Sequence, residues 1–382
     1  MSKWRKVRLG DIATYINGFA FKPSDWDTKG VPIIRIQNLT GSSNDVNYYN
    51  KHYDSKYEVN TGDVLISWSA SLGVYKWNQG KAILNQHIFK VVFDKLPVNK
   101  DYFVFAVQFL LSSLANQTHG STMKHITKQR FDNAVIPYPP IETQKQIAKT
   151  LNTVSELLYV RKQQLSELDN LIESVFYDMF GDPIKNDKGW KRKELSSCCY
   201  VNPKKTEINY FTDDLEVSFI PMASVSTNGE INTKEIRYYR EVKTGFTYFY
   251  ENDVLFAKIT PCMENGKGAI ARNLKNNIGF GSTEFHVLRP RKGISNSEWL
   301  YHLTALPVFR SSAEKYMTGS AGQKRVPASF FDKFLVPLPP LSLQDEFANI
   351  IRQIEEQKSL VKKAIEETQL LFDSLMSQYF DE

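Results

Sequence analysis

The feature that most constrains the fold of this chain is an internal repeat. Three segments recur in the same order: WRKVRL at 4–9 with WKRKEL at 190–195, GDVLI at 62–66 with NDVLF at 252–256, and IPYPPI at 136–141 with VPLPPL at 336–341. The offset between the copies grows from 186 to 190 and then to 200, so the second copy has gained 14 residues within its interior. A unit with matching ends and a different interior predicts two domains that share one scaffold and carry different loops.

Each copy is predicted to have a β-rich first part and a helical second part. Short β-branched and aromatic runs are punctuated by Gly, Asn and Ser clusters, as expected of strands and turns. The clearest runs are Val31–Ile36, Val64–Trp68, Ile88–Phe93, Asp253–Ile259 and Glu284–Leu288. The predicted boundaries are a β-rich domain over 1–136, a long helix over 137–183, a second β-rich domain over 184–336 and a second long helix over 337–382.

The two helical parts carry apolar residues at alternating steps of four and three, which is a heptad pattern. The predicted seam comprises Ile147, Leu151, Val154, Leu158, Leu165, Leu168, Ile172 and Val175 in the first helix and Phe347, Ile351, Ile354, Val361, Ile365, Phe372 and Leu375 in the second. Arg161, Lys358 and Thr368 interrupt it. Each helix should run about 38 residues, or roughly 57 Å.

Two seams in the same register predict that the helices pack against each other as a coiled-coil spacer. We expect an antiparallel pair, because the chain must return past the first helix after building the second domain. Gly181-Asp182-Pro183 is a helix stop signal that ends the first helix. The alternative is that the helices only complete the core of a helical domain. The predicted fold is therefore α+β, with two mixed β-rich domains, two long antiparallel coiled-coil helices and a pseudo-two-fold internal repeat.

Composition excludes some classes of protein and allows others. Hydrophobic residues make up 42% of the 382 residues, which excludes a disordered chain. The net charge of +6 is compatible with a polyanionic partner but is not specific for one. The three cysteines form no CxxC pair, the six histidines show no metal-ligand spacing, and the N-terminus does not resemble a signal peptide. We expect a cytoplasmic protein without a metal.

Known catalytic motifs are incomplete in this sequence. Asn202-Pro203-Lys204-Lys205 lacks the second proline and the aromatic residue of an amino-methyltransferase loop, and Gly266-Lys267-Gly268-Ala269 is not a phosphate-binding loop. Asp253 and Lys258 suggest a nuclease, but Phe256 stands where the second carboxylate is needed. Asp63 and Asp253 occupy equivalent positions of the repeat, which favours a role in capping a turn. We predict no catalytic residues.

Taken together, these segments resemble the specificity (S) subunits of type I restriction–modification systems. The resemblance covers essentially the whole chain and depends on the order of its carriers. These are GDVLISWS at 62–69, NQH at 85–87, DVLFAKITPCMENGK at 253–267, GSTEF at 281–285, and the Pro-x-Pro-Pro-x-x-x-Gln junctions that lead into both long helices.

The resemblance implies a non-catalytic, DNA-binding subunit. Its two target recognition domains, 1–136 and 184–336, would each read one half of a split, asymmetric DNA site. Its helices would set the gap and dock two modification (M) methyltransferase subunits, which methylate adenine, and restriction (R) subunits would join to cleave DNA. S-adenosylmethionine, ATP and Mg²⁺ would be held by the partner subunits, with no cofactor in this chain.

Base readout requires side chains that can hydrogen-bond base edges, with cations nearby for phosphates. The candidates in the first domain are Arg35, Gln37, Asn38, Ser67, Trp68, Ser69, Lys124, His125 and Lys128. Those in the second domain are Lys258, Thr260, Asn265, Lys267, Gln323, Lys324 and Arg325. The first domain has Arg35, Gln37 and Asn38 on an expected loop edge, where the second has Pro221, Ala223 and Ser224. This difference predicts two unlike half-sites.

Two other functions remain open from the sequence alone. The chain could be a stand-alone duplicated module that binds protein or RNA, which would work without M subunits. It could also be a nuclease, in which case DNA cleavage would depend on Asp253.

Overall fold

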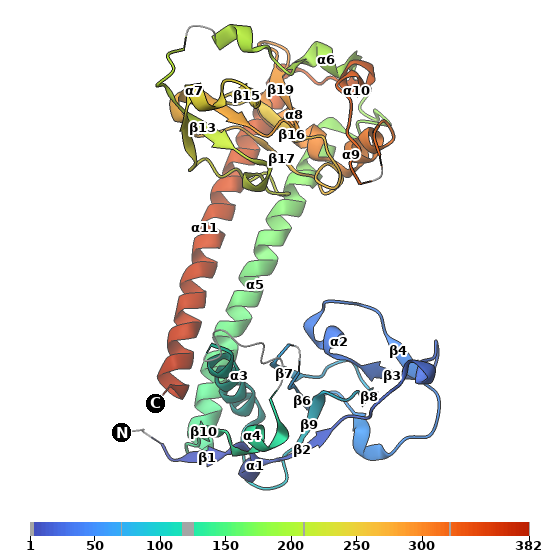
Figure 1. Cartoon of the computed structure of the whole chain (residues 1–382), viewed down its shortest axis with the longest axis vertical. Helices are drawn as coiled ribbons and strands as arrows, with labels where there is room; N and C mark the ends of the chain where they lie inside the picture. The colour runs from blue at the N-terminus through green and yellow to red at the C-terminus, as the bar shows by residue number, and fades with distance from the viewer. Residues whose placement is uncertain (1–3, 70, 117–125, 209–210, 321, 382) are drawn as a thin grey trace. The chain divides into compact units, whose positions relative to one another are not determined.

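The computed structural model describes residues 4–69, 71–116, 126–208, 211–320 and 322–381. The chain divides into two compact units (Figure 1). Unit 1 comprises residues 1–162 and 363–382, and unit 2 comprises residues 163–362. The boundary between the units falls near the middle of each long helix, so each helix has one half in each unit.

Unit 1 contains two four-stranded sheets among its described residues. Their strand orders are β2-β9-β6-β7 and β4-β3-β8-β5, with β3 and β8 parallel and all other neighbours antiparallel. A separate antiparallel pair joins β1 (Lys6–Arg8) to β10 (Val135–Pro137). The remaining strands are β2 Thr14–Asn17, β3 Val31–Ile34, β4 Asn47–Tyr49, β5 Glu58–Val59, β6 Val64–Ser67, β7 Gly73–Lys76, β8 Ala82–Leu84 and β9 Ile88–Val92. The helices are α1 Leu9–Ile12, α2 Ile36–Thr40, α3 Lys100–Asn116, α4 Lys128–Asn133 and the short 3-10 segments Pro23–Asp25 and Ser55–Tyr57.

Unit 2 repeats this topology strand for strand. Its sheets have the orders β12-β19-β16-β17 and β14-β13-β18-β15, with β13 and β18 parallel, and β11 (Arg192–Glu194) pairs with β20 (Leu335–Pro337). The strands are β12 Cys199–Val201, β13 Glu216–Ile220, β14 Ile236–Tyr238, β15 Thr247–Tyr250, β16 Val254–Ala257, β17 Gly268–Ile270, β18 Ile278–Gly281 and β19 Phe285–Pro290. The helices are α6 Leu195–Cys198, α7 Tyr239–Val242, α8 Ser297–Ala305, α9 Pro307–Glu314, α10 Ser329–Lys333 and the 3-10 segments Lys205–Ile208, Met222–Ser224 and Lys275–Asn277.

The strands β6 and β16 are continuous apolar runs because both of their faces are buried. Successive side chains of a strand point to opposite faces. In β6, Val64 and Ile66 join the core that includes α3, whereas Leu65 joins the core beneath the second sheet. In β16, Val254 and Phe256 likewise lie in one core and Leu255 in the other. Each unit therefore has a helical layer on one side of this sheet and a second sheet on the other.

A tight turn precedes each of these strands, and its geometry explains why Gly or Asn followed by Asp occurs in both copies of the repeat. Gly62 and Asn252 occupy equivalent positions and have positive φ angles of 92° and 69°, a region that Gly and Asn tolerate best. The next residue is an aspartate whose carboxylate accepts the backbone N–H three residues earlier, from Asn60 to Asp63 at 2.9 Å and from Tyr250 to Asp253 at 2.8 Å. The duplicated aspartate therefore caps a turn.

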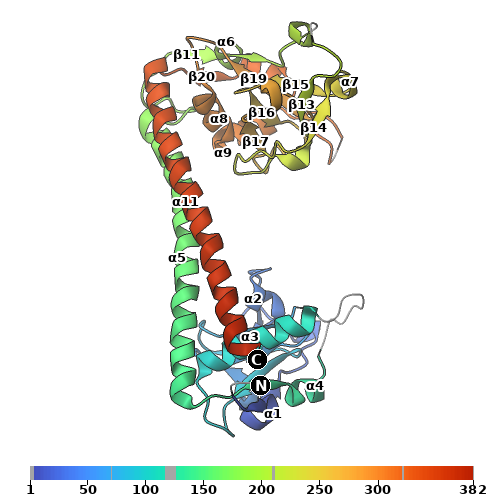
Figure 2. The same ribbon diagram turned by 90° about the vertical axis from the view of Figure 1, so that its left-hand side faces the viewer.

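The long helices α5 (Ile141–Phe180) and α11 (Leu341–Phe380) have 40 residues each and pack antiparallel within each unit (Figure 2). In unit 1, the first half of α5 shares a core with Phe372, Met376 and Phe380 from the last turns of α11. In unit 2, Phe176 and Phe180 of α5 contact Phe347 from the first turns of α11, with ring centroids 5.7 and 5.1 Å apart. Twelve heptad positions are buried: Ile147, Leu151, Val154, Leu158, Ile172, Phe347, Ile351, Ile354, Lys358, Val361, Thr368 and Phe372.

The polar interruptions of the seam have partners on the facing helix. The Arg161 guanidinium donates to the Ala364 carbonyl and to the Thr368 hydroxyl. Lys358, whose side chain is only 6% exposed, lies 2.8 Å from Asp169 on the facing helix and 2.7 Å from Glu355 on its own helix. Buried polar groups of this kind are satisfied in only one alignment of two helices, so they favour this register over a slipped one.

The Pro-x-Pro-Pro-x-x-x-Gln motif joins each long helix to its domain through a buried glutamine. Gln144 and Gln344 are both 0% exposed. Gln144 donates to the Pro139 carbonyl and accepts the N–H of Asn99 at the start of α3. Gln344 repeats this with the Pro339 carbonyl and with Asn296 at the start of α8. The motif therefore fixes the angle at which each helix leaves its domain.

The predicted α+β fold, with two β-sheet domains each followed by a long helix and with the helices packed together, is confirmed. Local details differ from the prediction. The strand expected over Val31–Ile36 ends at Ile34, and the β-rich parts also contain helices such as α3 and α8. Among the described residues, no helix combines the length and apolarity needed to cross a bilayer.

Candidate nucleic-acid interface

In unit 2, the structure brings two predicted segments together that are far apart in the sequence. Ile259 and Arg325 form an antiparallel bridge. The N–H of Val326 donates to the carbonyl of Lys258 at 2.9 Å, and the N–H of Thr260 donates to the carbonyl of Lys324 at 3.0 Å. The loop after β16 and the loop after α9 therefore form one continuous surface, which we call the 258/325 surface.

A carboxylate lies within this surface. Glu284, just before β19, accepts two hydrogen bonds from Arg325: Nε lies 2.9 Å from Oε2, and Nη2 lies 2.8 Å from Oε1. This pairing lowers the pKa of Glu284, so the carboxylate remains charged well below neutral pH. The half-buried Lys258 lies near the pair, and desolvation lowers the pKa of its ammonium group.

The other predicted residues of unit 2 differ in their exposure. Thr260 donates its hydroxyl to Glu264 at 2.7 Å, and Lys267 donates to the Met222 carbonyl at 3.2 Å, so both also hold the loop in place. Asn265, Gln323 and Lys324 are exposed. The surface therefore presents an amide on each loop and cationic groups beside them, a combination suited to base edges and phosphates.

Buried side chains support the surface from below. Arg310 of α9 is 5% exposed and donates to the carbonyls of Thr304 (2.7 Å), Met263 (3.3 Å) and Gly266 (3.4 Å). His286 lies 2.8 Å from the Val326 carbonyl through Nε2 and 3.0 Å from the Asn202 amide through Nδ1. These contacts tie both loops to the β16–β19 sheet.

The buried His286 predicts a pH dependence of stability. Burial is the largest of the effects that lower the pKa of His286, to about 4, against about 6.5 in an unfolded chain. Between these values the unfolded chain binds the additional proton, so the free energy of unfolding should decrease by about 3 kcal/mol as the pH falls from 7 to 4. In urea titrations across this range, His286→Gln should show a decrease that is smaller by about this amount. Parallel curves for the two proteins would contradict the assignment.

In unit 1, the same backbone connection exists at the equivalent position. The N–H of Ile126 donates to the carbonyl of Trp68 at 2.9 Å, matching Val326 and Lys258 in unit 2. Trp68 lies 5.0 Å from His87 and 5.7 Å from Phe89 between ring centroids, and its indole N–H donates to Asn17 at 3.2 Å. The predicted residues Lys124 and His125 lie outside the described residues.

The three candidates after β3 are placed differently from the expectation. Gln37 and Asn38 lie in the short helix α2 rather than on a loop edge, with Arg35 at its N-cap. The Asn38 side chain accepts the Arg35 N–H at 3.0 Å and donates to the Asp45 carbonyl at 2.9 Å. Arg35 stacks over Trp26 at 4.9 Å and donates to Asn47 at 3.2 Å. Asn38 therefore shapes this end of the sheet, and the Gln37 carbonyl accepts the Ser42 N–H at 3.1 Å, just beyond the end of the helix.

Two further candidates of unit 1 have structural partners. Ser67 is 0% exposed, and its hydroxyl donates to the Ser71 carbonyl, so the structure assigns it to the turn after β6 rather than to the surface. Lys128, in the first turn of α4, is exposed and forms a 2.8 Å ion pair with Asp132. Ser69 is half-buried beside Trp68.

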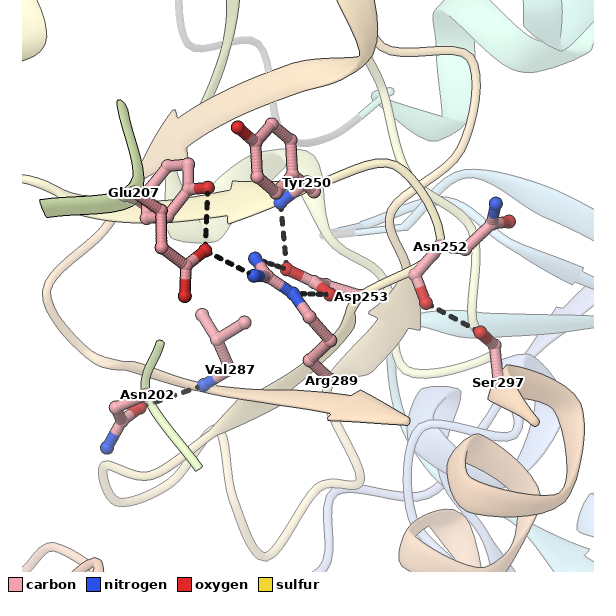
Figure 3. Close-up of polar contacts among 9 residues, drawn as sticks. Asn202, Glu207, Tyr250, Asn252, Asp253, Val287, Arg289 and Ser297 are labelled. Carbon is pink, nitrogen blue, oxygen red and sulfur yellow. Dashed lines mark hydrogen bonds and ion pairs between the residues drawn. The ribbon is translucent and has the colours of Figure 1, made fainter. Parts of the chain in front are cut away.

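The suggested nuclease residue Asp253 is engaged in a buried polar cluster (Figure 3). The residue is 1% exposed, and its two oxygens accept Nε and Nη2 of Arg289 at 2.8 and 2.7 Å. Arg289 also donates to Glu207 at 2.6 Å, and the Tyr250 N–H donates to Asp253 (Figure 3). Both carboxylate oxygens thus already accept hydrogen bonds within the protein, so Asp253 has a structural role.

The sequence did not single out Glu284, His286 or Arg310 as parts of this surface. Their partners lie 41, 40 and up to 47 residues away, so no local pattern connects them. The one local signal was the position of Glu284 next to Gly-Ser-Thr in a segment that matches Asn85-Gln86-His87 of the first copy. In the described part of the chain, no group of three or more His, Cys, Asp or Glu side chains is arranged to hold a metal ion.

Comparison with known proteins gives a consistent result. The family model described as type I restriction modification DNA specificity domain matches residues 1–170 and 187–369. The specificity subunit of the type I restriction enzyme EcoAI from Escherichia coli is 42% identical over 183 residues, covering 46% of this chain and 31% of that subunit. The EcoEI specificity subunit from Escherichia coli is 37% identical over 206 residues, covering 52% and 34%. These matches thus span about a third of the relatives' own length.

Longer but weaker similarity extends over the whole chain. The MjaVIII specificity subunit of Methanocaldococcus jannaschii is 23% identical over 396 aligned residues, covering 98% of this chain and 91% of that subunit. The crystal structure of the type I restriction–modification S subunit from M. genitalium matches 99% of this chain and 96% of its own with a TM-score of 0.53 at 13% identity. A chain from a structure on complex assembly of the type I restriction–modification system gives a TM-score of 0.59 at 15% identity, covering 98% and 97%. The structural matches show a shared fold.

Proposed function

This chain belongs to the family of type I restriction–modification DNA specificity proteins, and we propose that it is the DNA-reading subunit of such a system. Each β-sheet domain would read one half of a split, asymmetric site. The observation that carries this proposal is the duplicated scaffold with unlike side chains at equivalent surface positions, such as Trp68 and Lys258. Two identical domains would favour a symmetric site, whereas two domains with different surface side chains favour two different half-sites.

In this proposal the chain performs no chemistry. It assembles in the cytoplasm with two M subunits, which supply S-adenosylmethionine and methylate adenine, and with R subunits that use ATP and Mg²⁺. The three free cysteines, two of them buried, fit a reducing compartment. The domain boundaries at 136, 183 and 336 remain proposed functional divisions, with the long helices as the spacer between the reading domains.

We propose that the DNA-contacting residues are those of the 258/325 surface and its unit 1 counterpart. In unit 2 these are Lys258, Thr260, Asn265, Lys267, Gln323, Lys324 and Arg325. In unit 1 they are Trp68, Ser69, Arg35, Gln37 and Lys128, with Lys124 and His125 proposed from the sequence alone. Lysines at such a surface would neutralise phosphates, and binding should therefore weaken as salt concentration rises.

The test is selection of bound DNA from a pool of random duplexes by the purified full-length chain, followed by sequencing. We expect a motif with two unlike halves separated by a fixed number of unspecified base pairs. Lys324→Ala should weaken binding to all sequences in the pool and leave both halves of the motif unchanged. If the chain enriches RNA or no DNA motif at all, the alternative of a stand-alone binding module is supported instead.

A further inference from the structure

The geometry of the Glu284–Arg325 pair suggests how unit 2 selects a base. We propose that Arg325 reads one guanine in the half-site of unit 2 and that Glu284 is the positioning residue that aims it. This inference rests on the proposed function and refines it. It adds Glu284 to the residues that determine specificity, and it names the base that the pair selects.

Some N–H groups of the Arg325 guanidinium donate to partners within the protein, and others remain available to DNA. Nε lies 2.9 and 3.2 Å from the two oxygens of Glu284, and Nη2 lies 2.8 Å from Oε1. Nη1 donates to the Gln323 carbonyl at 3.0 Å. A guanidinium has five N–H bonds, so one hydrogen on each terminal nitrogen remains. Two donors on adjacent nitrogens are what the N7 and O6 acceptors of guanine require in the major groove.

The pair is exposed enough to reach DNA. The Arg325 side chain is 42% exposed and that of Glu284 is 25% exposed. The carboxylate holds the edge of the guanidinium that carries Nε. A fork fixed in this way loses less conformational entropy on binding than a free arginine side chain, and it discriminates more sharply because it cannot turn to another acceptor.

Both residues are also fixed through their backbones. Arg325 exchanges two backbone hydrogen bonds with Thr318, at 2.8 and 3.0 Å. The Glu284 carbonyl accepts the N–H of Lys258 at 2.9 Å. Because the backbones of Arg325 and Glu284 are both hydrogen-bonded to neighbouring segments, the side-chain pair has a defined position relative to the rest of the surface, as base readout requires.

The equivalent position of unit 1 carries a different group. The N–H of Trp68 donates to the carbonyl of His87 at 3.2 Å, just as Lys258 donates to Glu284. His87 therefore occupies the place of Glu284, and an imidazole cannot form the same two-oxygen clamp on a guanidinium. Among the described residues, the clamped arginine therefore lies in unit 2, and we expect the guanine that it selects in the half-site of unit 2.

A carboxylate could also read a base directly, by accepting the amino group of cytosine. Here Glu284 already accepts three N–H···O contacts from Arg325. The observations therefore favour a positioning role, and direct cytosine reading by Glu284 becomes an outcome that the experiment can detect.

The experiment compares the motifs that full-length variants select from a pool of random DNA duplexes. Arg325→Ala should relax the preference for guanine at one position of one half-site by about 5- to 150-fold, with the other positions retained. Glu284→Gln should relax the same position to a smaller extent, because the neutral amide cannot clamp the guanidinium with two acceptors. Lys324→Ala, the exposed neighbour, should weaken binding without changing any base preference.

The inference is overturned if Arg325→Ala and Glu284→Gln affect different positions, or if either leaves every guanine preference intact. Loss of a cytosine preference in Glu284→Gln alone would assign direct reading to the carboxylate and would also overturn it. Because Glu284→Gln keeps the size of the side chain, its far-ultraviolet circular dichroism should match that of the wild type. Failure of the wild-type chain to select any motif would instead refute the proposed function itself.

Discussion

Adding four residues to each long helix, after Lys162 in α5 and after Ala364 in α11, should lengthen the gap of the selected DNA motif by one to two base pairs. Four residues extend a helix by about 6 Å, and base pairs are about 3.4 Å apart along DNA. These insertion points face each other across the seam, since Arg161 contacts Ala364 and Thr368. Both half-sites should remain unchanged. The measurement is selection from random duplexes with the wild-type and lengthened chains.

The matched control is the same insertion in α5 alone. It moves the seam of one helix past the other, separating Arg161 from Thr368 or Lys358 from Asp169, and it should therefore lower the free energy of unfolding. An altered half-site with an unchanged gap in the doubly lengthened chain would show that the helices do not set the spacing.

Replacing Arg289 by leucine should lower the free energy of unfolding by about 3–5 kcal/mol, because it leaves Asp253 charged and buried without a cationic partner. Urea denaturation measures the change. The double variant Arg289→Leu with Asp253→Asn should recover part of the loss, since no uncompensated charge remains. Arg352→Leu, an exposed arginine of α11, is the matched control and should change stability by no more than about 0.5 kcal/mol.

The same variants separate the structural role of Asp253 from the nuclease alternative. If Asp253 served catalysis, Asp253→Asn would remove a metal-dependent DNA cleavage activity of the purified chain and leave its stability nearly unchanged. We expect instead that Asp253→Asn lowers the free energy of unfolding. An Arg289→Leu variant as stable as the wild type would contradict the account of the cluster in Figure 3.

The fold could be predicted from the sequence because its main signals are periodic or duplicated. The heptads of α5 and α11 follow from side-chain spacing on a helix, and the repeat implies one topology twice. The turn-capping role of Asp63 and Asp253 was visible because both copies retain it. Both signals are present in the sequence itself, as regular spacing along a helix or as one segment written twice.

The arrangement of the 258/325 surface could not be predicted in the same way. Glu284 meets Arg325 across 41 residues, and His286 supports Val326 across 40, so chain topology alone brings them together. The helix α2 was missed because Ile36–Thr40 is too short to show a helical period and follows a strand directly. Ser67 was expected at the surface, but the turn to Ser71 uses its hydroxyl within the fold.

The central claim, that two unlike domains on one duplicated scaffold direct methylation to a split site, is tested most directly by mapping N6-methyladenine across a genome. The cells should express this chain together with the methyltransferase subunit of its system and lack other adenine methyltransferases. We expect methylation in one motif with two different halves and a fixed gap, and its disappearance when this chain is omitted. A contiguous motif, two identical halves, or methylation that persists without this chain would contradict the claim.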